Sequence, residues 1–202
     1  MTIQKPCATS AEQNKQSILE VLRELLVDGD LVVELGSGTG QHACYFARAM
    51  QGIAWQPTEL RSMLPVIRLW LEDEGSDNIR PPLELDVNEA DWGVTSSDVV
   101  YTANTLHIIS KPAIESLFAG VGRLLTEGGR FCAYGPFKFS GEHTSPSNAA
   151  FDQQLRDQDP RSGVRDIAWL NTLAQANGLL DAELIEMPAN NFIAVWHHVK
   201  LN

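Results

Sequence analysis

The amino-acid sequence predicts an α/β fold, with a mostly parallel sheet and helices on both of its faces. Strand-like and helix-like segments alternate along most of the 202 residues, as they do when helical crossovers join parallel strands. The last two strand-like segments, 182–186 and 192–199, are joined by too few residues for a parallel crossover, so they should pair antiparallel. The length suits a single domain over 1–202.

Apolar periodicity defines the elements of the first half. Apolar side chains recur at helical spacing, and short β-branched runs separate these helical patterns. The predicted elements are a helix through 18–25 that stops around 28–30, a strand at 31–35, a helix at 43–50, a strand at 53–55 and a helix at 64–71. Pro65 is compatible with the last of these helices only in its first turn.

The second half continues the alternation. The predicted elements are strands at 83–85 and 98–102, a helix at 114–125, a strand at 131–134 and a helix at 166–177. Gly128 and Gly129 should close the first of these helices, and Gly178 should follow the second. With the two C-terminal segments, the prediction is a seven-stranded sheet with an antiparallel C-terminal strand.

One segment, 136–165, interrupts this regularity. It is rich in Pro, Gly, Ser, Asn and Asp. Because so long a connection in a compact domain is usually functional, we expect a lid or a substrate-binding segment here. A variable surface insertion is the alternative.

Composition restricts the partners and the compartment. With 15 basic and 26 acidic side chains the net charge is −11, which disfavours nucleic acid as a partner and repels the chain from anionic membranes. Cys7, Cys44 and Cys132 lack the spacing of a disulfide framework or a metal site, and the N-terminus lacks the apolar core of a signal peptide. These features predict a cytoplasmic protein that contains no structural metal.

The stretch from Glu34 to Gly40, Glu-Leu-Gly-Ser-Gly-Thr-Gly, joins a predicted strand to a predicted helix. Glycines at such a turn let the backbone approach a ligand closely, although a plain tight turn is the alternative. A dinucleotide fingerprint would need a small residue where Gln41 stands. A carboxylate at position 34 would repel a pyrophosphate but suits a ligand that carries an ammonium group.

Glu59 follows the second predicted strand. A carboxylate there can accept hydrogen bonds from both hydroxyls of a ribose. The alternative is an acidic residue that stabilises a helix N-terminus.

The acid-x-Gly-x-Gly-x-Gly pattern resembles the first motif of the class I S-adenosylmethionine-dependent methyltransferases, which have a Rossmann-like fold. The resemblance implies that the turn holds the methionine part of S-adenosylmethionine and that Asp86 contacts the adenine, although a turn aspartate is the alternative at that position. The cofactor-binding residues expected on this basis are Glu34, Gly36, Ser37, Gly38, Gly40, Glu59, Leu60, Asp86, Val87 and Asn104.

Further stretches along the whole chain resemble a family of methyltransferase-like proteins of uncharacterised substrate, a domain-of-unknown-function group that includes animal methyltransferase-like protein 26. They include Asn14-Lys15, Gly40-Gln41-His42, Trp55-Gln56-Pro57, Tyr134-Gly135-Pro136, Gly163-Val164-Arg165-Asp166 and Met187-Pro188-Ala189-Asn190-Asn191. Thr58-Glu59 departs from the Ser-Asp expected there, but glutamate keeps the charge that the ribose contact requires.

Methyl transfer from a sulfonium needs alignment and exclusion of water, and needs a base only when the acceptor arrives protonated. The candidate catalytic residues are His107, Tyr134, Lys138 and His143, with Asn148 and Asp152 as further polar groups. A core histidine at 107 and solvated loop side chains at 138 and 143 are the alternatives. The chain lacks the Asn-Pro-Pro-aromatic motif of amino methyltransferases after its fourth strand, which disfavours nucleobases and glutamine amides as acceptors.

Three hypotheses follow for the function. The first is a methyltransferase that acts on a small molecule and releases S-adenosylhomocysteine. The second is a non-catalytic S-adenosylmethionine-binding protein or partner subunit. The third, a nicotinamide-dependent oxidoreductase, is opposed by Glu34 and Gln41.

Overall fold

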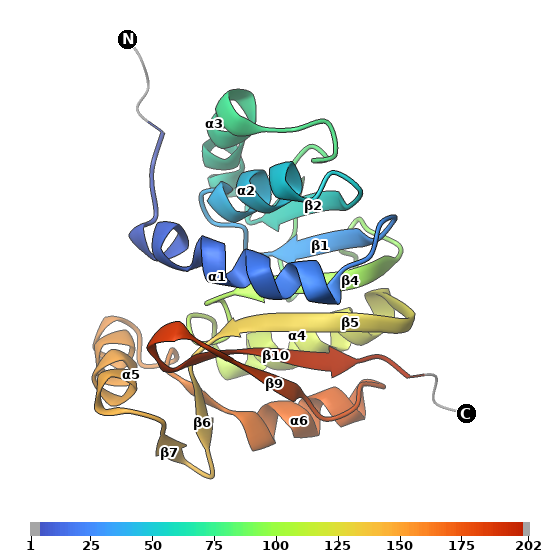
Figure 1. The fold of residues 1–202 in the computed structure, drawn as a ribbon. Helices are drawn as coiled ribbons and strands as arrows, with labels where there is room; N and C mark the ends of the chain where they lie inside the picture. Colours follow the sequence, from blue (N-terminus) through green and yellow to red (C-terminus); the bar gives the residue numbers. More distant parts are fainter. Residues whose placement is uncertain (1–4, 200–202) are drawn as a thin grey trace. The chain divides into compact units, whose positions relative to one another are not determined.

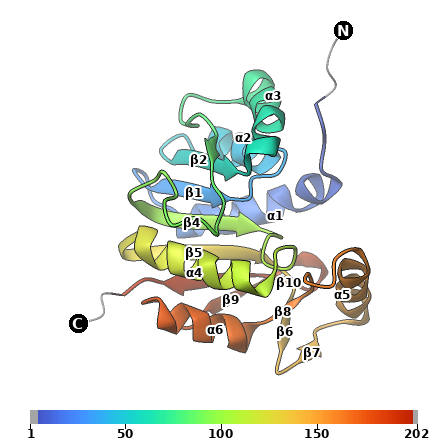
Figure 2. The ribbon, with the colours of Figure 1, turned by 180° about the vertical axis from the view of Figure 1, so that it is seen from behind.

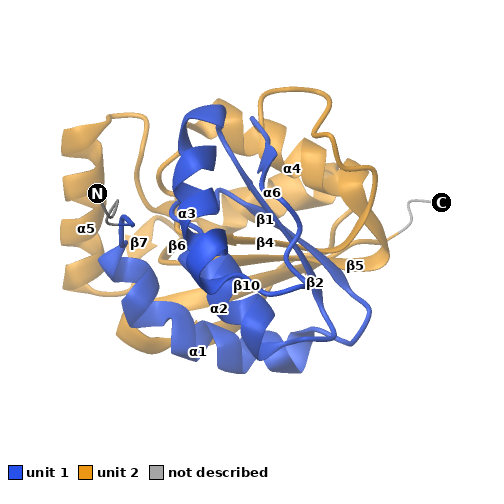
Figure 3. Cartoon of the chain, turned by 90° about the horizontal axis from the view of Figure 1, so that it is seen from above, with its two compact units in different colours: residues 1–86 blue, residues 87–202 orange. Residues whose placement is uncertain are grey.

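The computed structural model describes residues 5–199 (Figure 1). The chain divides into two compact units, residues 1–86 and 87–202, coloured blue and orange in Figure 3. Within the described residues the main sheet has seven strands. The first unit contributes three of these strands, and the second contributes the other four.

The first unit alternates helices with parallel strands. Its elements are α1 (Thr9–Leu25), β1 (Leu31–Leu35), α2 (Gln41–Ala49), β2 (Ala54–Glu59), a 3-10 turn (Arg61–Met63), α3 (Leu64–Glu74) and β3 (Leu83–Glu84). β2 pairs in parallel with β1 on one side and with β3 on the other. The carboxyl ends of these strands therefore lie at one edge of the sheet.

Apolar side chains of the helices and strands form the core of the first unit. Ile18 and Leu22 of α1 and Val32 of β1 are fully buried. The ring of Phe46 on α2 lies 5.6 Å from the ring of Trp55 on β2. Burial of such large side chains contributes roughly 1.5–3 kcal/mol each, which fixes α2 on the strand that follows it.

The second unit contains the rest of the main sheet and a second, smaller sheet. Its elements are β4 (Ser97–Ala103), α4 (Lys111–Leu124), β5 (Leu125–Gly135), β6 (Phe137–Phe139), β7 (Glu142–His143), α5 (Pro146–Gln158), β8 (Arg165–Asp166), α6 (Ile167–Ala176), β9 (Glu183–Met187), a 3-10 turn (Pro188–Asn190) and β10 (Asn191–His197). β4 and β5 are parallel, and β10 runs antiparallel to both β5 and β9. Figure 2 shows α4 and α6 side by side on one face of these strands.

Three aromatic rings pack against one another in the core of the second unit. Phe118 of α4 meets Phe131 of β5 and Trp196 of β10 edge to face, in each case with ring centroids 5.4 Å apart. Phe131 and Trp196 stack on each other at 5.2 Å. All three side chains are fully buried, so this cluster fixes α4 against the sheet.

The observed architecture confirms the predicted fold class, an α/β fold with a mostly parallel seven-stranded sheet. The antiparallel pairing of the two C-terminal segments is also confirmed. Pro65 lies in the first turn of α3, as predicted. Within residues 5–199, no helix has both the length and the apolar character needed to cross a lipid bilayer.

Several predicted boundaries are wrong. α1 begins at Thr9 rather than near 18, and β5 begins at Leu125 rather than at 131. The second strand, predicted at 53–55, continues to Glu59. Its buried polar side chains Gln56 and Thr58 are satisfied by hydrogen bonds, so the strand does not show the apolar pattern that the prediction relied on. Gly128 and Gly129 do not close the helix, which ends at Leu124. They lie inside β5, where the pairing with β4 shifts register between Ser97 and Val99.

The segment 136–165 is not an irregular connection. It contains β6 and β7, which pair as a hairpin, and the 13-residue helix α5. The hydroxyl of Ser145 caps this helix by accepting a hydrogen bond from the N–H of Asn148. Sequence periodicity misses the helix because its buried face contains Asn148 and Asp152 rather than apolar residues.

A glycine in α4 provides a test of this packing. A Cβ atom added to Gly120 would lie 1.9 Å from Cζ2 of the buried Trp92. We expect Gly120→Ala to lower the free energy of unfolding by about 1–3 kcal/mol through overpacking, as measured by urea denaturation. The control Glu115→Ala, on an exposed position of the same helix, should change it by less than about 0.5 kcal/mol. Equal stability of both variants would contradict the packing described.

Candidate functional site

The turn between β1 and α2 has a backbone conformation that only glycine adopts readily. Gly36, Gly38 and Gly40 all have positive φ, at 70°, 56° and 89°. Gly40 is also the N-cap residue of α2. A residue with a side chain would be strained in this conformation, so the path of the chain requires the three glycines.

Glu34, the last residue but one of β1, lies beneath this turn. Its side-chain Oε2 accepts hydrogen bonds from the hydroxyl of Ser37 at 2.9 Å and from the indole N–H of Trp55 at 3.0 Å. The residue is only 2% exposed. Burial raises the pKa of this carboxyl group to about 7, although the two hydrogen bonds oppose the shift. Glu34 thus holds the turn from inside the protein.

A second set of hydrogen bonds joins the turn to β2. The backbone N–H of Ser37 donates to the carbonyl of Thr58 at 3.0 Å, and the N–H of Thr58 donates to the hydroxyl oxygen of Ser37 at 3.1 Å. The hydroxyl of Thr58 donates to the carbonyl of Glu34 at 2.7 Å. All of these groups are buried, so the turn has little freedom to change shape.

Glu59 ends β2, and its carboxylate contacts the glycine turn directly. One oxygen accepts from the N–H of Gly38 at 3.0 Å, and the other accepts from the N–H of Leu60 at 2.8 Å. The backbone carbonyl of Glu59 accepts from the N–H of Leu85, at the end of β3. The side chain of Leu60 is exposed, and Asp86, next after Leu85, is half-buried.

The space above the turn is open at Gly38 and filled at Gly40. A Cβ atom on Gly38 would meet no atom within 4 Å, whereas a Cβ on Gly40 would lie 3.1 Å from Cγ2 of Ile67 on α3. Gly40 therefore serves the packing of α2 against α3. Gly38 instead leaves room beside the carboxylate of Glu59.

The sequence prediction missed a role of Gln41, which it used only as evidence against a dinucleotide. The side chain of Gln41 accepts from the hydroxyl of Thr39 at 2.8 Å and donates to the carboxylate of Glu12 on α1 at 2.6 Å. One residue on, His42 shares a hydrogen bond with Asn14 of α1 at 2.8 Å. These polar contacts tie α1 to the glycine turn. They join residues 29 and 28 positions apart in the sequence, so no local sequence pattern signals them.

In the second unit, Asn104, His107 and Gly135 converge after the ends of β4 and β5. Asn104 has a positive φ of 63°, and its N–H donates to the carbonyl of Tyr134 at 2.9 Å. A Cβ on Gly135 would lie 3.0 Å from Cε1 of His107 and 3.7 Å from Oδ1 of Asn104. A strained asparagine at the carboxyl end of a strand is typical of a functional position.

His107 is a buried histidine in this structure. It is 3% exposed, and burial lowers its pKa to about 3, assisted by the charge of Arg165. Its ring packs edge to face on Phe151 of α5 at 5.3 Å. The imidazole is therefore neutral and weakly basic at physiological pH.

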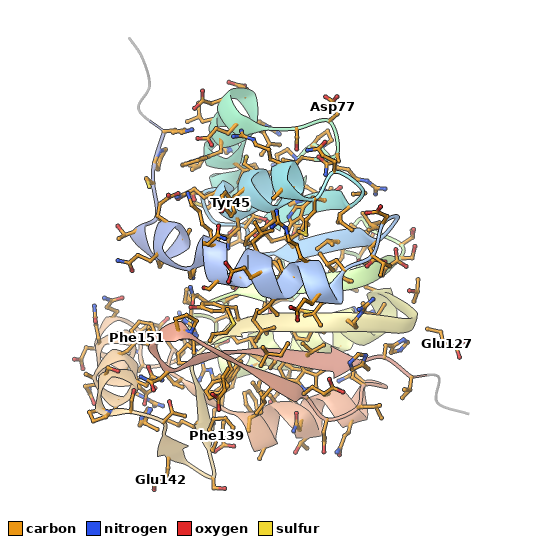
Figure 4. All side chains as sticks on the ribbon, in the orientation of Figure 1. Tyr45, Asp77, Glu127, Phe139, Glu142 and Phe151 are labelled. Atoms are coloured by element: carbon orange, nitrogen blue, oxygen red, sulfur yellow. The ribbon has the colours of Figure 1, made fainter. Side chains whose placement is uncertain are left out.

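Lys138 and His143 face each other across the β6–β7 hairpin, on which Figure 4 labels Phe139 and Glu142. Both side chains approach one carboxylate oxygen of Asp152, Lys138 at 2.9 Å and His143 at 3.3 Å. Burial raises the pKa of Asp152, but the hydrogen bonds from Lys138 and Arg156 outweigh it, so the net shift is downward. Lys138 is thus held as an ion-pair partner.

The remaining predicted residues have varied positions. Tyr134 is buried in β5, and Val87 is half-buried just after Asp86. Asn148 is buried on α5 and donates hydrogen bonds to Thr144 and to the carbonyl of Asn190. The roles assigned to these residues from the sequence stay predictions.

The fold is shared with methyltransferases of known structure. The structure of an O-methyltransferase family protein from Burkholderia thailandensis matches with a TM-score of 0.81 at 15% identity, over 96% of this chain and 58% of that one. Human N-acetylserotonin methyltransferase, solved in complex with S-adenosylmethionine, matches with a TM-score of 0.80 at 14% identity, over 95% and 53%. The S-adenosylmethionine-dependent methyltransferase SibL matches with a TM-score of 0.79 at 18% identity, over 95% and 56%.

These likenesses show that the chain has the Rossmann-like fold of S-adenosylmethionine-dependent methyltransferases. The chain spans a little over half the length of each of these proteins. The model of the family described as "Protein of unknown function (DUF938)" matches residues 5–198. The chain belongs to this family.

The raised pKa of Glu34 predicts a dependence of stability on pH. The pKa of this carboxyl group is about 7 in the folded chain, against an ordinary value of 4.5 for the unfolded chain. Its protonation therefore stabilises the fold fully below pH 4.5, and this stabilisation is lost as the pH rises through 7. Between pH 5 and pH 8 the loss is roughly 1–3 kcal/mol. Glu34→Gln should remove that part of the change, as measured by urea denaturation at the two pH values.

A matched control is Glu72→Gln, which changes an exposed carboxylate of α3 in the same unit. This variant should keep the pH dependence of the parent. If Glu34→Gln and the parent lose the same free energy of unfolding between pH 5 and pH 8, the carboxyl group of Glu34 does not have the burial described.

Proposed function

We propose that the glycine turn of the first unit binds S-adenosylmethionine and that the protein transfers its methyl group to a small molecule. The observation that carries this proposal is the open space at Gly38, directly beside the carboxylate of Glu59. A ligand in this space would meet a carboxylate suited to ribose hydroxyls and the exposed apolar side chain of Leu60.

The buried carboxyl group of Glu34 adds support. An ammonium group above the turn would favour its ionised form, whereas the phosphates of a dinucleotide would disfavour it. With a pKa near 7, a modest attraction is enough to ionise this group at physiological pH. The proposal therefore assigns Gly36, Ser37 and Gly38 to the amino-acid end of the cofactor, with Glu34 beneath them.

The adenosine end is assigned to the carboxyl ends of β2 and β3. Glu59 would accept from the ribose hydroxyls, and Leu60, Asp86 and Val87 would lie around the adenine. Kinship with animal methyltransferase-like protein 26 is part of the same proposal, and it rests on the stretches common to that group along the whole chain.

S-adenosylmethionine supplies an electrophilic methyl group, so the protein itself has mainly to orient the acceptor and exclude water. In the second unit, Asn104 and Tyr134 are the polar candidates for orienting an acceptor. Burial lowers the pKa of His107, which makes it a poor base, and Lys138 is engaged in an ion pair with Asp152. The proposed reaction thus suits an acceptor atom that is already unprotonated.

A second function is favoured by the same observation. A protein that binds S-adenosylmethionine without turnover, or a partner subunit, would keep the turn of the first unit and would need no base. Release of S-adenosylhomocysteine in a screen of small-molecule acceptors would decide for the enzyme. Tight cofactor binding with no release across the screen would decide for the non-catalytic protein.

The first test of cofactor binding is isothermal titration calorimetry with S-adenosylmethionine, S-adenosylhomocysteine and NAD. We expect saturable binding of the two sulfur compounds and none of NAD. Gly38→Val should abolish binding, because its side chain fills the open space above the turn.

Gly29→Val is the matched control for backbone strain. Gly29 also has a positive φ, 100°, with nothing within 4 Å of an added Cβ, but it lies in the turn before β1. This variant should lose stability and still bind S-adenosylhomocysteine. Binding of NAD alone would overturn the proposal in favour of an oxidoreductase, as would undiminished cofactor binding by Gly38→Val.

The ribose contact has its own test. Glu59→Ala should weaken the binding of S-adenosylhomocysteine by roughly 1.5–3 kcal/mol, the usual loss for hydrogen bonds to a charged group. Glu84→Ala, which removes the exposed carboxylate opposite Glu59 on β3, should leave affinity unchanged. Equal affinities of the two variants would show that Glu59 does not hold the ribose.

A further inference from the structure

The second unit contains a small pocket lined mainly by basic side chains. Its volume is about 160 Å³, and its lining includes Lys111, Lys138, Arg156 and Arg165 together with the ring of Trp169. In a chain with a net charge of −11, four cations around one cavity are a strong local departure from the overall charge.

The nearby carboxylates do not neutralise this group. Asp152 is shared between Lys138 and Arg156, and its other oxygen accepts from the N–H of Val164 at 2.6 Å. Asp166 accepts from the N–H groups of Gly141 and Ala168. Four cations against these two carboxylates leave an excess of positive charge at the pocket.

Arg165 is held by backbone carbonyl groups. It is 4% exposed, and its guanidinium donates to the backbone carbonyls of Leu106, Ile109 and Arg161 rather than to a carboxylate. Burial lowers the pKa of Arg165 and the charge of Arg156 lowers it further, while the charge of Asp152 opposes this shift only in part. An anion in the pocket would relieve the cost of this buried charge.

Two helices add to the positive potential. Lys111 is the first residue of α4, and Asp166 is the N-cap of α6, so both helices begin at the pocket. The N-terminal ends of helices favour anions. Lys111 also lies over the ring of Trp169 at 5.4 Å, a position from which its ammonium group can reach a ligand.

We propose that this pocket binds the anionic group, carboxylate or phosphate, of a small molecule. The volume suits one such group rather than a whole cofactor. Lys111 and Arg156, the more exposed cations, contact the ligand, while Arg165 supplies charge from beneath. The site lies wholly within residues 87–202, so it does not depend on the cofactor proposal.

The pocket is tested by calorimetric titration of the full chain with inorganic phosphate, and in a separate arm with acetate, at low ionic strength. We expect saturable binding of at least one anion, weakened by added NaCl. Lys111→Gln and Arg156→Gln should each weaken it at least about threefold. Arg123→Gln removes one exposed charge from the same helix, α4, and should bind as the parent does.

Tryptophan fluorescence reports on the place of binding. The bound anion should change the emission of the parent, and Trp169→Phe should lose that change. Stronger binding in the phosphate arm would assign a phosphate ligand, and stronger binding in the acetate arm a carboxylate ligand. Absence of binding in both arms would overturn the proposal, as would unchanged affinity in both Lys111→Gln and Arg156→Gln.

Discussion

The buried carboxyl group of Glu34 is the constraint on which the first unit depends. It must lie beneath a turn whose three glycines take a conformation that strains other residues, and it must find hydrogen-bond donors there. Ser37 and Trp55 provide them, one from the turn and the other from the neighbouring strand. The turn is thereby attached to β2, and the carboxylate of Glu59 at the end of β2 accepts a hydrogen bond from Gly38 of the turn. A single acidic residue thus links the path of the chain to the shape of the proposed cofactor site.

Most of the fold could be predicted from the sequence because apolar side chains determine it. The helices around Ile18, Phe46 and Phe118 show the spacing of one buried face, and the strands are short β-branched runs. The prediction failed where polar groups are buried instead. β2 runs on through Gln56 and Thr58, and α5 packs through Asn148 and Asp152. Hydrogen bonds that decide such elements depend on partners far away in the sequence, which no local pattern contains.

The proposed site was predictable to a similar extent. The glycines and Glu34 are adjacent in the sequence, so their chemistry could be inferred from their spacing. The contact between Glu59 and Gly38 could be inferred only from the rule that parallel strands end at one edge. The low basicity of His107 and the ion pair of Lys138 could not be predicted at all, because burial and pairing arise from tertiary packing. The four basic residues of the second pocket are likewise scattered between positions 111 and 165.

The two units therefore present different chemistry. The first has a rigid turn with acidic residues and open space, and the second has a basic pocket and a strained asparagine.

The central claim is that the open space at Gly38 receives S-adenosylmethionine. The most direct measurement is a ¹H–¹⁵N correlation spectrum of the chain titrated with S-adenosylhomocysteine. The account predicts saturable shifts of the amide signals of Gly36, Gly38 and Leu60, and no such shifts with NAD. Amide signals of the turn that stay unmoved by S-adenosylhomocysteine would contradict it.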